Sequence, residues 1–314
     1  EFPEQVKRVV IDFPNPWSAK KISYLKSIWF FLKSLVKIII IFRKVRAVSI
    51  IGFGGYPSAA SMLAGFIMRI PSAIHEQNSV LGRVNKIFSS RVNLIVFGIK
   101  PLIKPCVKVK TRILGNPVRR SILEVIPKKY SQLNSDVFVI LALGGSQGAS
   151  FVSSIVCDTI VSLPKGIRNK IRIVHQCRQE DVKGVQEKYD RYNINCLVKI
   201  FFDDISNHLN SANLIISRSG ASSLAEFCIF GRPSILIPLP SAVGNHQVKN
   251  AFVMEEAGAS LVFNQENIST KSLGDKILYL LKNFTIANKM SLSAKKLAKP
   301  DAADSLADEL EQLI

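Results

Sequence analysis

The sequence predicts an α/β protein of two domains, each built on a parallel sheet. Short apolar runs alternate with longer segments of helical periodicity along most of the chain, which is typical of strand-helix-strand units with parallel strands. Polar and glycine-rich turns follow several apolar runs, at the strand ends where open α/β sheets bind ligands. The 314 residues are enough for two domains of ordinary size, each with its own core.

Residues 20–46 predict an amphipathic helix with a narrow basic stripe. At about 100° per residue, the side chains of Lys26, Lys33, Lys37 and Lys44 lie close to one line along it. A membrane-spanning helix needs about 20 nearly uncharged residues, which is more than any uncharged run offers here. Two interpretations remain: a helix lying on anionic lipid, or a core helix whose lysines reach solvent.

The next residues predict the first sheet. A strand over 47–51 enters the turn Gly52-Phe-Gly-Gly-Tyr-Pro-Ser58 and a helix over 59–68, and strands over 72–74 and 92–97 follow. The polar run His75-Glu-Gln-Asn78 stands where the second of these strands ends. The segment 121–135 is polar and bears lysines, so it predicts the linker between the domains.

The second sheet is predicted to begin with an apolar strand over 137–143. It enters Gly144-Gly-Ser-Gln-Gly-Ala149, a phosphate-type loop before a helix that ends near residue 163. Further strands are expected over 171–176, 196–201, 214–217 and 234–238, and an acidic amphipathic helix over 301–313. The chain therefore ends on a helix whose apolar face needs a partner.

The stretch Arg218-Ser-Gly-Ala-Ser-Ser-Leu-Ala-Glu226 reads as a tight turn and a helix after the strand 214–217. Amides at the start of that helix would face a phosphate. The carboxylate of Glu226 could accept both hydroxyls of a ribose placed on the turn. Many α/β proteins contain such a turn without a nucleotide, so this segment alone is a weak indication of nucleotide binding.

Composition restricts the partners. The formal net charge of +19 attracts polyanions, acidic lipid surfaces or phosphorylated substrates without choosing among them. The hydrophobic fraction of 47% argues against long disordered segments. The five cysteines have neither CxxC nor metal-ligand spacing, so we expect reduced thiols in a cytosolic protein, with no disulfide and no zinc.

Six motifs in one order carry a family resemblance. They are Gly52-Phe-Gly-Gly-Tyr-Pro-Ser58, Ile74-His-Glu-Gln-Asn78, Gly115-Asn-Pro-Val-Arg119, Gly144-Gly-Ser-Gln-Gly-Ala149, Arg218-Ser-Gly-Ala221 with Glu226, and His246-Gln-Val-Lys-Asn-Ala251. From about residue 47 onward, the chain resembles the MurG family. These bacterial transferases move N-acetylglucosamine from UDP onto lipid I, the undecaprenyl-pyrophosphoryl-N-acetylmuramyl pentapeptide, which forms lipid II.

The resemblance implies a GT-B fold, in which two Rossmann-like domains face a central cleft. Residues 1–120 would hold the acceptor and meet the membrane, and residues 121–301 would bind the UDP-sugar. Residues 302–314 would pack back on the first domain. The family's initial Gly-Gly-Thr-Gly-Gly-His loop has no counterpart in these residues, so the first domain is expected to be N-terminally truncated.

The resemblance also places site residues. Donor-binding positions are Arg119, Ser146, Phe202, Arg218, Ser219, Glu226 and Gln247, and acceptor-binding positions are Gly54, Gly55, Tyr56, Asn78 and Asn85. Arg119 and Ser146 would meet the diphosphate, Glu226 the ribose, the backbone near Phe202 the uracil and Gln247 the sugar hydroxyls, while Arg218 and Ser219 would shape the phosphate turn. His75 and Glu76 are the candidates for activating the acceptor, unless they form a polar network that merely closes the sheet.

The implied reaction is an inverting displacement at the anomeric carbon by the muramyl 4-hydroxyl. No cofactor and no metal are expected, since no DxD motif is placed to hold one. The expected partners are UDP-N-acetylglucosamine, lipid I, an anionic membrane surface and proteins of cell-wall synthesis, but no nucleic acid. The expected location is the cytoplasmic face of the bacterial inner membrane, as a peripheral protein.

Three alternatives stay open from the sequence. The chain could be a truncated, non-catalytic fragment that still binds a UDP-sugar, or a GT-B transferase with a different acceptor. Charge alone would also fit a basic protein that binds nucleic acid or a lipid surface. The last alternative lacks support, because the sequence has no helix-turn-helix signal and no basic strand interleaved with aromatic residues.

Overall fold

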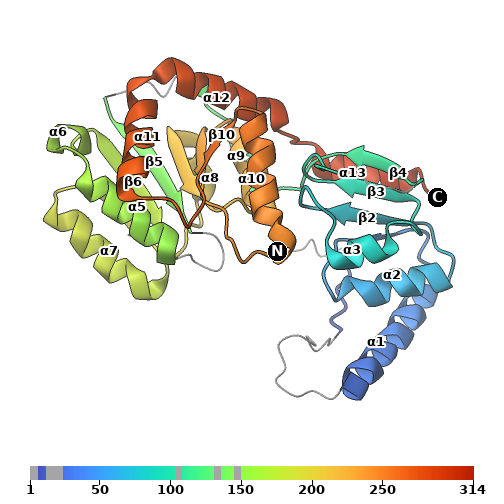
Figure 1. Ribbon diagram of the computed structural model, residues 1–314. Coiled ribbons are helices and arrows are strands. Elements are labelled where there is room, and N and C mark those ends of the chain that lie inside the picture. The colour runs from blue at the N-terminus through green and yellow to red at the C-terminus, as the bar shows by residue number, and fades with distance from the viewer. Residues whose placement is uncertain (1–5, 12–23, 104–107, 131–135, 145–149) are drawn as a thin grey trace.

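The computed structural model describes residues 6–11, 24–103, 108–130, 136–144 and 150–314, which form two α/β domains side by side (Figure 1). The first domain holds a parallel sheet in the order β1-β2-β3-β4. Its strands are β1 (Ile50–Gly52), β2 (Ser72–Glu76), β3 (Leu94–Phe97) and β4 (Lys110–Ile113). Every residue of β2 and β3 is buried, as expected for central parallel strands covered on both faces.

The second domain holds a parallel sheet in the order β10-β9-β8-β5-β6-β7. Its strands are β5 (Phe138–Leu143), β6 (Ile171–Gln176), β7 (Asn195–Lys199), β8 (Leu214–Ser217), β9 (Ser234–Leu236) and β10 (Ser260–Val262). Because β5 pairs with both β6 and β8, the strand order reverses between β5 and β8. In open α/β sheets a ligand crevice lies at such a reversal, outside the carboxyl ends of the strands.

Helices cover both faces of the second sheet (Figure 1). Alternate residues of β5 divide between two cores, with Ile140 and Ala142 in one and Leu141 and Leu143 in the other, as the two-residue period of a strand requires. The first core includes α5 (Ser150–Ser162), α7 (Gln179–Arg191) and α11 (Thr270–Lys282), near the short α6 (Lys165–Arg168). The second includes α4 (Arg120–Leu123), α8 (Ile205–Ser211), α9 (Ala221–Phe230) and α10 (His246–Glu256), with α12 (Phe284–Leu297) contributing to both.

The first sheet is covered on one face by α2 (Ser58–Ile67) and α3 (Arg83–Phe88). Its other face is covered by the last helix, α13 (Ala302–Glu311), whose Leu306 packs with Leu94 and Val96. Glu309 adds ion pairs to Lys110 Nζ at 2.6 Å and to Arg112 Nε at 2.9 Å. The chain therefore passes between the domains twice, before α4 and after α12.

The two passages touch each other at Gly115. This residue has φ +94°, and a Cβ placed there would lie 2.4 Å from Cβ of Lys299. Both the left-handed backbone and the close approach require glycine. The contact between Gly115 and Lys299 joins the two interdomain segments into one hinge.

The N-terminal helix α1 (Tyr24–Val45) packs on α2 rather than on a sheet. Leu35 and Ile38 are buried against Ala60 and Ala64, whose small side chains allow the helices to approach closely. One side of α1 is therefore part of the core, as the second of the two interpretations of this segment expected. Within the described residues, no helix is long and apolar enough to cross a membrane.

Two strands and the linker differ from the sequence prediction. β4 was not predicted because every one of its residues is exposed, and the three residues of β10 were also missed. Ile122 and Tyr130, within the predicted linker, are buried in the cores of the second domain. Part of the predicted linker 121–135 therefore belongs to the second domain.

Candidate active site

The turn after β8 lies at the reversal of strand order in the second sheet, and the side chain of Arg218 holds this turn in place. This side chain is buried, and its Nη1 donates to the carbonyls of Ile237 at 2.9 Å and Pro238 at 3.1 Å. Its Nη2 donates to Gln265 Oε1 at 2.6 Å. Burial lowers the pKa of the guanidinium. Arg218 thus braces the turns after β8 and β9.

Ser219 and Gln247 continue this bracing. Ser219 is fully buried, and its Oγ donates to the backbone carbonyl of Gln247 at 2.7 Å. Gln247 Oε1 accepts from the amide of Leu239 at 3.0 Å. α9 starts behind this turn with Gly220 as its N-cap and no side chain capping it. Within the described residues, no side chain caps the start of α9, which is favourable for a site that receives a phosphate.

Arg119 and Glu226 lie together across the domain link. Arg119 Nη2 and Nε donate to Glu226 Oε1 at 2.9 Å and 3.2 Å. The glutamate side chain is 14% exposed and the arginine side chain 52% exposed. Burial raises the pKa of Glu226, and the charge and hydrogen bonds of Arg119 oppose that rise. The structure thus brings together the residue predicted to bind the diphosphate, Arg119, and the residue predicted to bind the ribose, Glu226.

Some predicted donor residues stand apart or lie outside the described residues. Ser146 and the rest of the loop 145–149 are not among those residues. Phe202 is buried in the second core of the second domain, with its ring 4.7 Å from that of His208. The contact of its backbone with a uracil stays a prediction. Within the described chain, no group of three or more His, Cys, Asp or Glu side chains could hold a metal ion.

On the first domain, Glu76 organises the loop that follows β2. The carboxylate is 2% exposed. Its Oε1 accepts from the backbone amide and Nδ2 of Asn78, both at 3.1 Å. Its Oε2 accepts from the amide of Gly82 at 2.7 Å and from Asn85 Nδ2 at 2.8 Å. Each carboxylate oxygen thus accepts two hydrogen bonds. In this geometry Glu76 holds the loop after β2 in its conformation.

His75 is fully buried at the end of β2. Its Nε2 lies 3.0 Å from the carbonyl of Gly115, and because a carbonyl only accepts, Nε2 carries the proton and donates. Nδ1 is buried without a hydrogen-bond partner in the described chain. Burial lowers the pKa of the imidazole, with the Gly115 carbonyl opposing. A neutral His75 thus ties β2 to the hinge.

The loop after β1 is packed against the same network. Gly54 has φ +75° and a Cβ there would lie 3.0 Å from Asn85 Nδ2. Gln77 Nε2 donates to the carbonyl of Phe53 at 2.9 Å. Gly55, with φ +74°, and Tyr56 complete this turn before α2. The predicted acceptor residues therefore form one connected set of loops at the ends of β1 and β2.

Asn250 joins the two halves of the site. This side chain on α10 is fully buried, and its Oδ1 accepts from the amide of Ser79 at 2.9 Å. Its Nδ2 donates to Asn78 Oδ1 at 2.9 Å and to the carbonyl of Ser219 at 3.2 Å. Asn250 lies within the motif His246-Gln-Val-Lys-Asn-Ala251, but no role was predicted for it. Its place one helical turn after His246 was the available signal.

The protein has two parallel-sheet domains, and the glycine-rich and polar loops of both meet between them. This arrangement defines the class of protein: a nucleotide-sugar glycosyltransferase of GT-B fold. The chain matches the description "Glycosyltransferase family 28 N-terminal domain" over residues 13–96 and "Glycosyltransferase family 28 C-terminal domain" over residues 139–306. Within that class, the chain belongs to the MurG family.

Curated relatives support this membership over nearly the whole chain. Proteins named "UDP-N-acetylglucosamine--N-acetylmuramyl-(pentapeptide) pyrophosphoryl-undecaprenol N-acetylglucosamine transferase" are similar to it. The one from Agrobacterium fabrum is 37% identical over 298 residues, covering 94% of this chain and 79% of the relative. The one from Paramagnetospirillum magneticum is 36% identical over 297 residues, covering 94% and 80%.

Solved structures agree on the fold. MurG of Acinetobacter baumannii matches with a TM-score of 0.74 at 26% identity, covering 98% of this chain and 84% of that one. A UDP-GlcNAc 2-epimerase from Neisseria meningitidis, bound to UDP-GlcNAc, matches with a TM-score of 0.63 at 13% identity, covering 93% and 83%. The second likeness concerns the fold alone. The predicted family and the predicted GT-B fold are confirmed.

Proposed function

We propose that this protein transfers N-acetylglucosamine from UDP-N-acetylglucosamine to the muramyl 4-hydroxyl of lipid I, forming lipid II. The observation that carries the proposal is the junction at Asn250, where the loop after β2 meets the turn after β8. A transferase must bring its donor and acceptor to one place, and this junction brings the two sets of loops within hydrogen-bond distance. The two substrates are inferred from membership of the MurG family.

The donor is proposed to lie at the reversal of strand order in the second sheet. The amides at the start of α9 and the loop 144–149 would receive the diphosphate, with Arg119 adding a positive charge. Glu226 would exchange its ion pair with Arg119 for the ribose hydroxyls. Gln247, on the first turn of α10, would meet the sugar hydroxyls. These groups would stabilise the charge that grows on the leaving UDP.

The acceptor is proposed to lie over the loops after β1 and β2. Gly54, Gly55 and Tyr56 would meet the lipid pyrophosphate, and Asn78 and Asn85 would line the path of the muramyl sugar. Activation of the acceptor hydroxyl by His75 or Glu76 remains a prediction. Both side chains are buried and hydrogen-bonded in the described geometry, which favours an organising role.

The test is transfer of labelled N-acetylglucosamine from UDP onto a lipid I analogue in detergent. It compares this chain with the same chain extended by a family-type glycine-rich loop at its N-terminus. A Glu226→Ala variant is expected to lose donor affinity, and Glu124→Ala, an exposed carboxylate, serves as the matched control. Binding of UDP-sugar without transfer by either chain would contradict the transferase proposal and support a donor-binding protein. Transfer to another lipid-linked sugar in preference to lipid I would contradict the proposed acceptor.

Association with the membrane is proposed to use the outer face of α1. Trp29, Leu32, Val36 and Ile40 are 57%, 51%, 56% and 59% exposed, and their spacing of three or four residues places them along one side of the helix. Lys33 Nζ lies 5.3 Å from the Trp29 ring centroid. Apolar side chains beside lysines are typical of a helix lying on anionic lipid. The location would then be peripheral, at the inner face of the bacterial membrane.

Co-sedimentation with vesicles of phosphatidylglycerol and phosphatidylcholine tests this surface. Replacing Leu32 and Val36 by serine is expected to weaken binding roughly thirtyfold, because each exchange removes an aliphatic contact with lipid worth about 1 kcal/mol. The matched control replaces Leu292 and Val243 on the second domain, which are 56% and 66% exposed. Equal losses in both double variants would exclude α1 as the lipid-binding face.

A further inference from the structure

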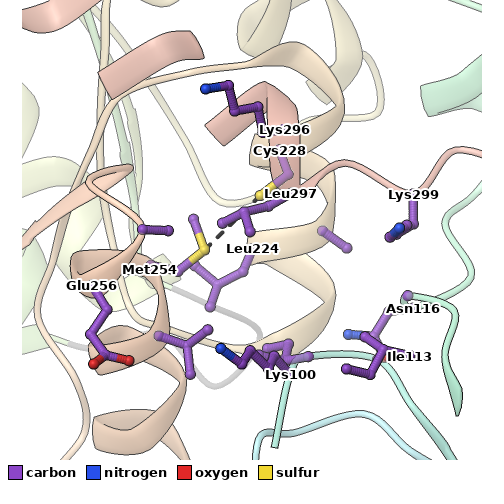
Figure 2. Close-up of a pocket in the computed structure, with 16 residues that line it drawn as sticks. Lys100, Ile113, Asn116, Leu224, Cys228, Met254, Glu256, Lys296, Leu297 and Lys299 are labelled. Atoms are coloured by element: carbon purple, nitrogen blue, oxygen red, sulfur yellow. Dashed lines mark hydrogen bonds between the residues drawn. The ribbon is translucent and has the colours of Figure 1, made fainter. Parts of the chain in front are cut away.

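A cavity of about 630 Å³ lies at the hinge between the domains (Figure 2). From the first domain it is lined by the chain just after β3 and around the end of β4. From the second it is lined by α9, by the C-terminal half of α10 and by the segment from the end of α12. None of the sixteen lining residues is a predicted donor, acceptor or catalytic residue. The cavity is therefore lined by residues other than those proposed for the active site, which it adjoins at Gly115 and Asn116.

The walls of this cavity are largely apolar. Leu224, Cys228 and Met254 are buried side chains of the second domain, and Cys228 Sγ lies 4.0 Å from Met254 Sδ (Figure 2). Ile99 and Ile113 close the cavity from the first domain. The volume is within the range of about 300–1,000 Å³ that is usual for small-molecule pockets. Such a space suits a compact ring system better than a long flexible chain.

One polar atom in the wall is left without a partner. Asn116 is 5% exposed, and its Nδ2 donates to the carbonyl of Gln77 at 3.0 Å and to that of Ala221 at 3.4 Å. Its Oδ1 is buried and accepts no hydrogen bond within the described chain. A Cβ on the neighbouring Gly98 would lie 1.9 Å from this oxygen, so glycine is needed to admit it. This oxygen lies against Gly98 and is buried, so Asn116 shapes the wall of the cavity and its oxygen does not face the space inside.

The rim of the cavity is positive. Lys100, Lys296 and Lys299 line it together with one carboxylate, Glu256, and all four residues are exposed. Their formal sum is +2, which favours an anion. Because the lysines come from both domains, an anionic head group could contact both at once.

We propose that this hinge cavity is a binding site for a small anion with a compact ring body. The ring would lie against Leu224 and Met254, and a carboxylate or phosphate would lie among the lysines. The occupant contacts both domains beside the touching passages at Gly115 and Lys299. Its binding therefore favours the domain arrangement described here, since a ligand stabilises the state that it contacts best.

Calorimetric titration with 2-naphthoate tests the site, because this probe has a ring body and a carboxylate. We expect saturable binding at one site per chain. 2-Naphthol, which lacks the charge, should bind several-fold more weakly. 2-Naphthyl phosphate binding more tightly than 2-naphthoate would assign a phosphate as the head group, and the reverse would assign a carboxylate. Affinity for 2-naphthol equal to that of 2-naphthoate would refute the anionic part of the proposal.

Variants locate the binding. Replacing Lys100, Lys296 and Lys299 by glutamine should weaken it roughly tenfold, since each exposed ionic contact contributes a fraction of the total. The matched control exchanges Lys165, Lys271 and Lys282, exposed lysines away from the cavity, and should leave the affinity unchanged. A separate change, Ala257→Leu, adds bulk at a lining residue with ordinary helical backbone and should abolish binding without altering charge. Unchanged affinity in both the lysine variant and the leucine variant would overturn the proposal.

Hydrogen exchange read by mass spectrometry gives an independent location. Saturating probe should slow amide exchange in peptides covering 98–103 and 296–301. Protection confined to 26–45 instead would show that the probe binds the apolar face of α1, and the hinge site would be rejected.

Discussion

Replacing Glu76 by glutamine separates an organising role from a catalytic one. The exchange keeps the shape of the side chain but converts one acceptor oxygen into a donor. The new NH₂ group can take the place of either carboxylate oxygen. In the Oε1 position it faces the backbone N–H of Asn78, and in the Oε2 position it faces the backbone N–H of Gly82, and neither backbone donor can rotate away. Each side also carries an asparagine Nδ2 donor. The substitution therefore removes two of the four hydrogen bonds to this buried group.

Hydrogen bonds to a charged acceptor contribute about 1.5 kcal/mol each at the lower end of their range. Losing two should lower the free energy of unfolding by about 3 kcal/mol. The loop 77–85 should lose its fixed shape at the same time, with a higher KM for the acceptor. Activity should fall together with stability, because both depend on the same network.

Urea denaturation and initial transfer rates measure the two effects on one preparation. Glu124→Gln is the control, since Glu124 is 61% exposed and pairs only with exposed Arg120, and its effect should stay within about 0.5 kcal/mol. An unfolding free energy equal to that of the unaltered protein, combined with lost turnover, would refute the organising role. That result would instead make Glu76 an acid or base in the reaction.

Three further predictions concern the hinge, the first core of the second domain and the junction. Gly115→Ala should lower the free energy of unfolding by about 2 kcal/mol or more, through its positive φ and its approach to Lys299; an unchanged denaturation midpoint would contradict this. Burial lowers the pKa of His175 to about 4, so its contribution to stability is complete above the unfolded pKa of about 6.5 and is lost as pH falls toward 4. Denaturation curves should show a loss of about 2 kcal/mol between pH 7.5 and 5, and His175→Gln should flatten this dependence. Asn250→Ala leaves the buried amide of Ser79 without its acceptor and should reduce kcat/KM at least tenfold; near-normal transfer kinetics would remove Asn250 from the site.

The sequence predicted those elements whose pattern is local. β5 is almost entirely apolar and was predicted within one residue, because a buried parallel strand needs only a continuous hydrophobic run. β4 has no such run, and its extended form comes from pairing with β3. A strand of that kind is defined by its neighbour in space, which no local pattern reveals.

The site shows the same division. The glycine-rich and polar turns identified the candidate loops, since glycine and side-chain donors are chemically recognisable in sequence. Their roles depended on contacts between distant segments. Ser79 meets Asn250 across 171 residues, and the saturation of Glu76 depends on Asn85 and Gly82 in the folded loop. Sequence could name Glu76 as a carboxylate of interest without showing that its lone pairs are occupied.

The position of α13 has a consequence for the order in which the protein is made. Leu306 covers Leu94 and Val96, yet these residues leave the ribosome about two hundred residues earlier in synthesis. Until the last helix emerges, one apolar face of the first sheet lacks its cover and can attract other chains. The second domain depends on no such late segment beyond α12. Folding during synthesis would therefore complete the second domain before the first, reversing their order along the chain.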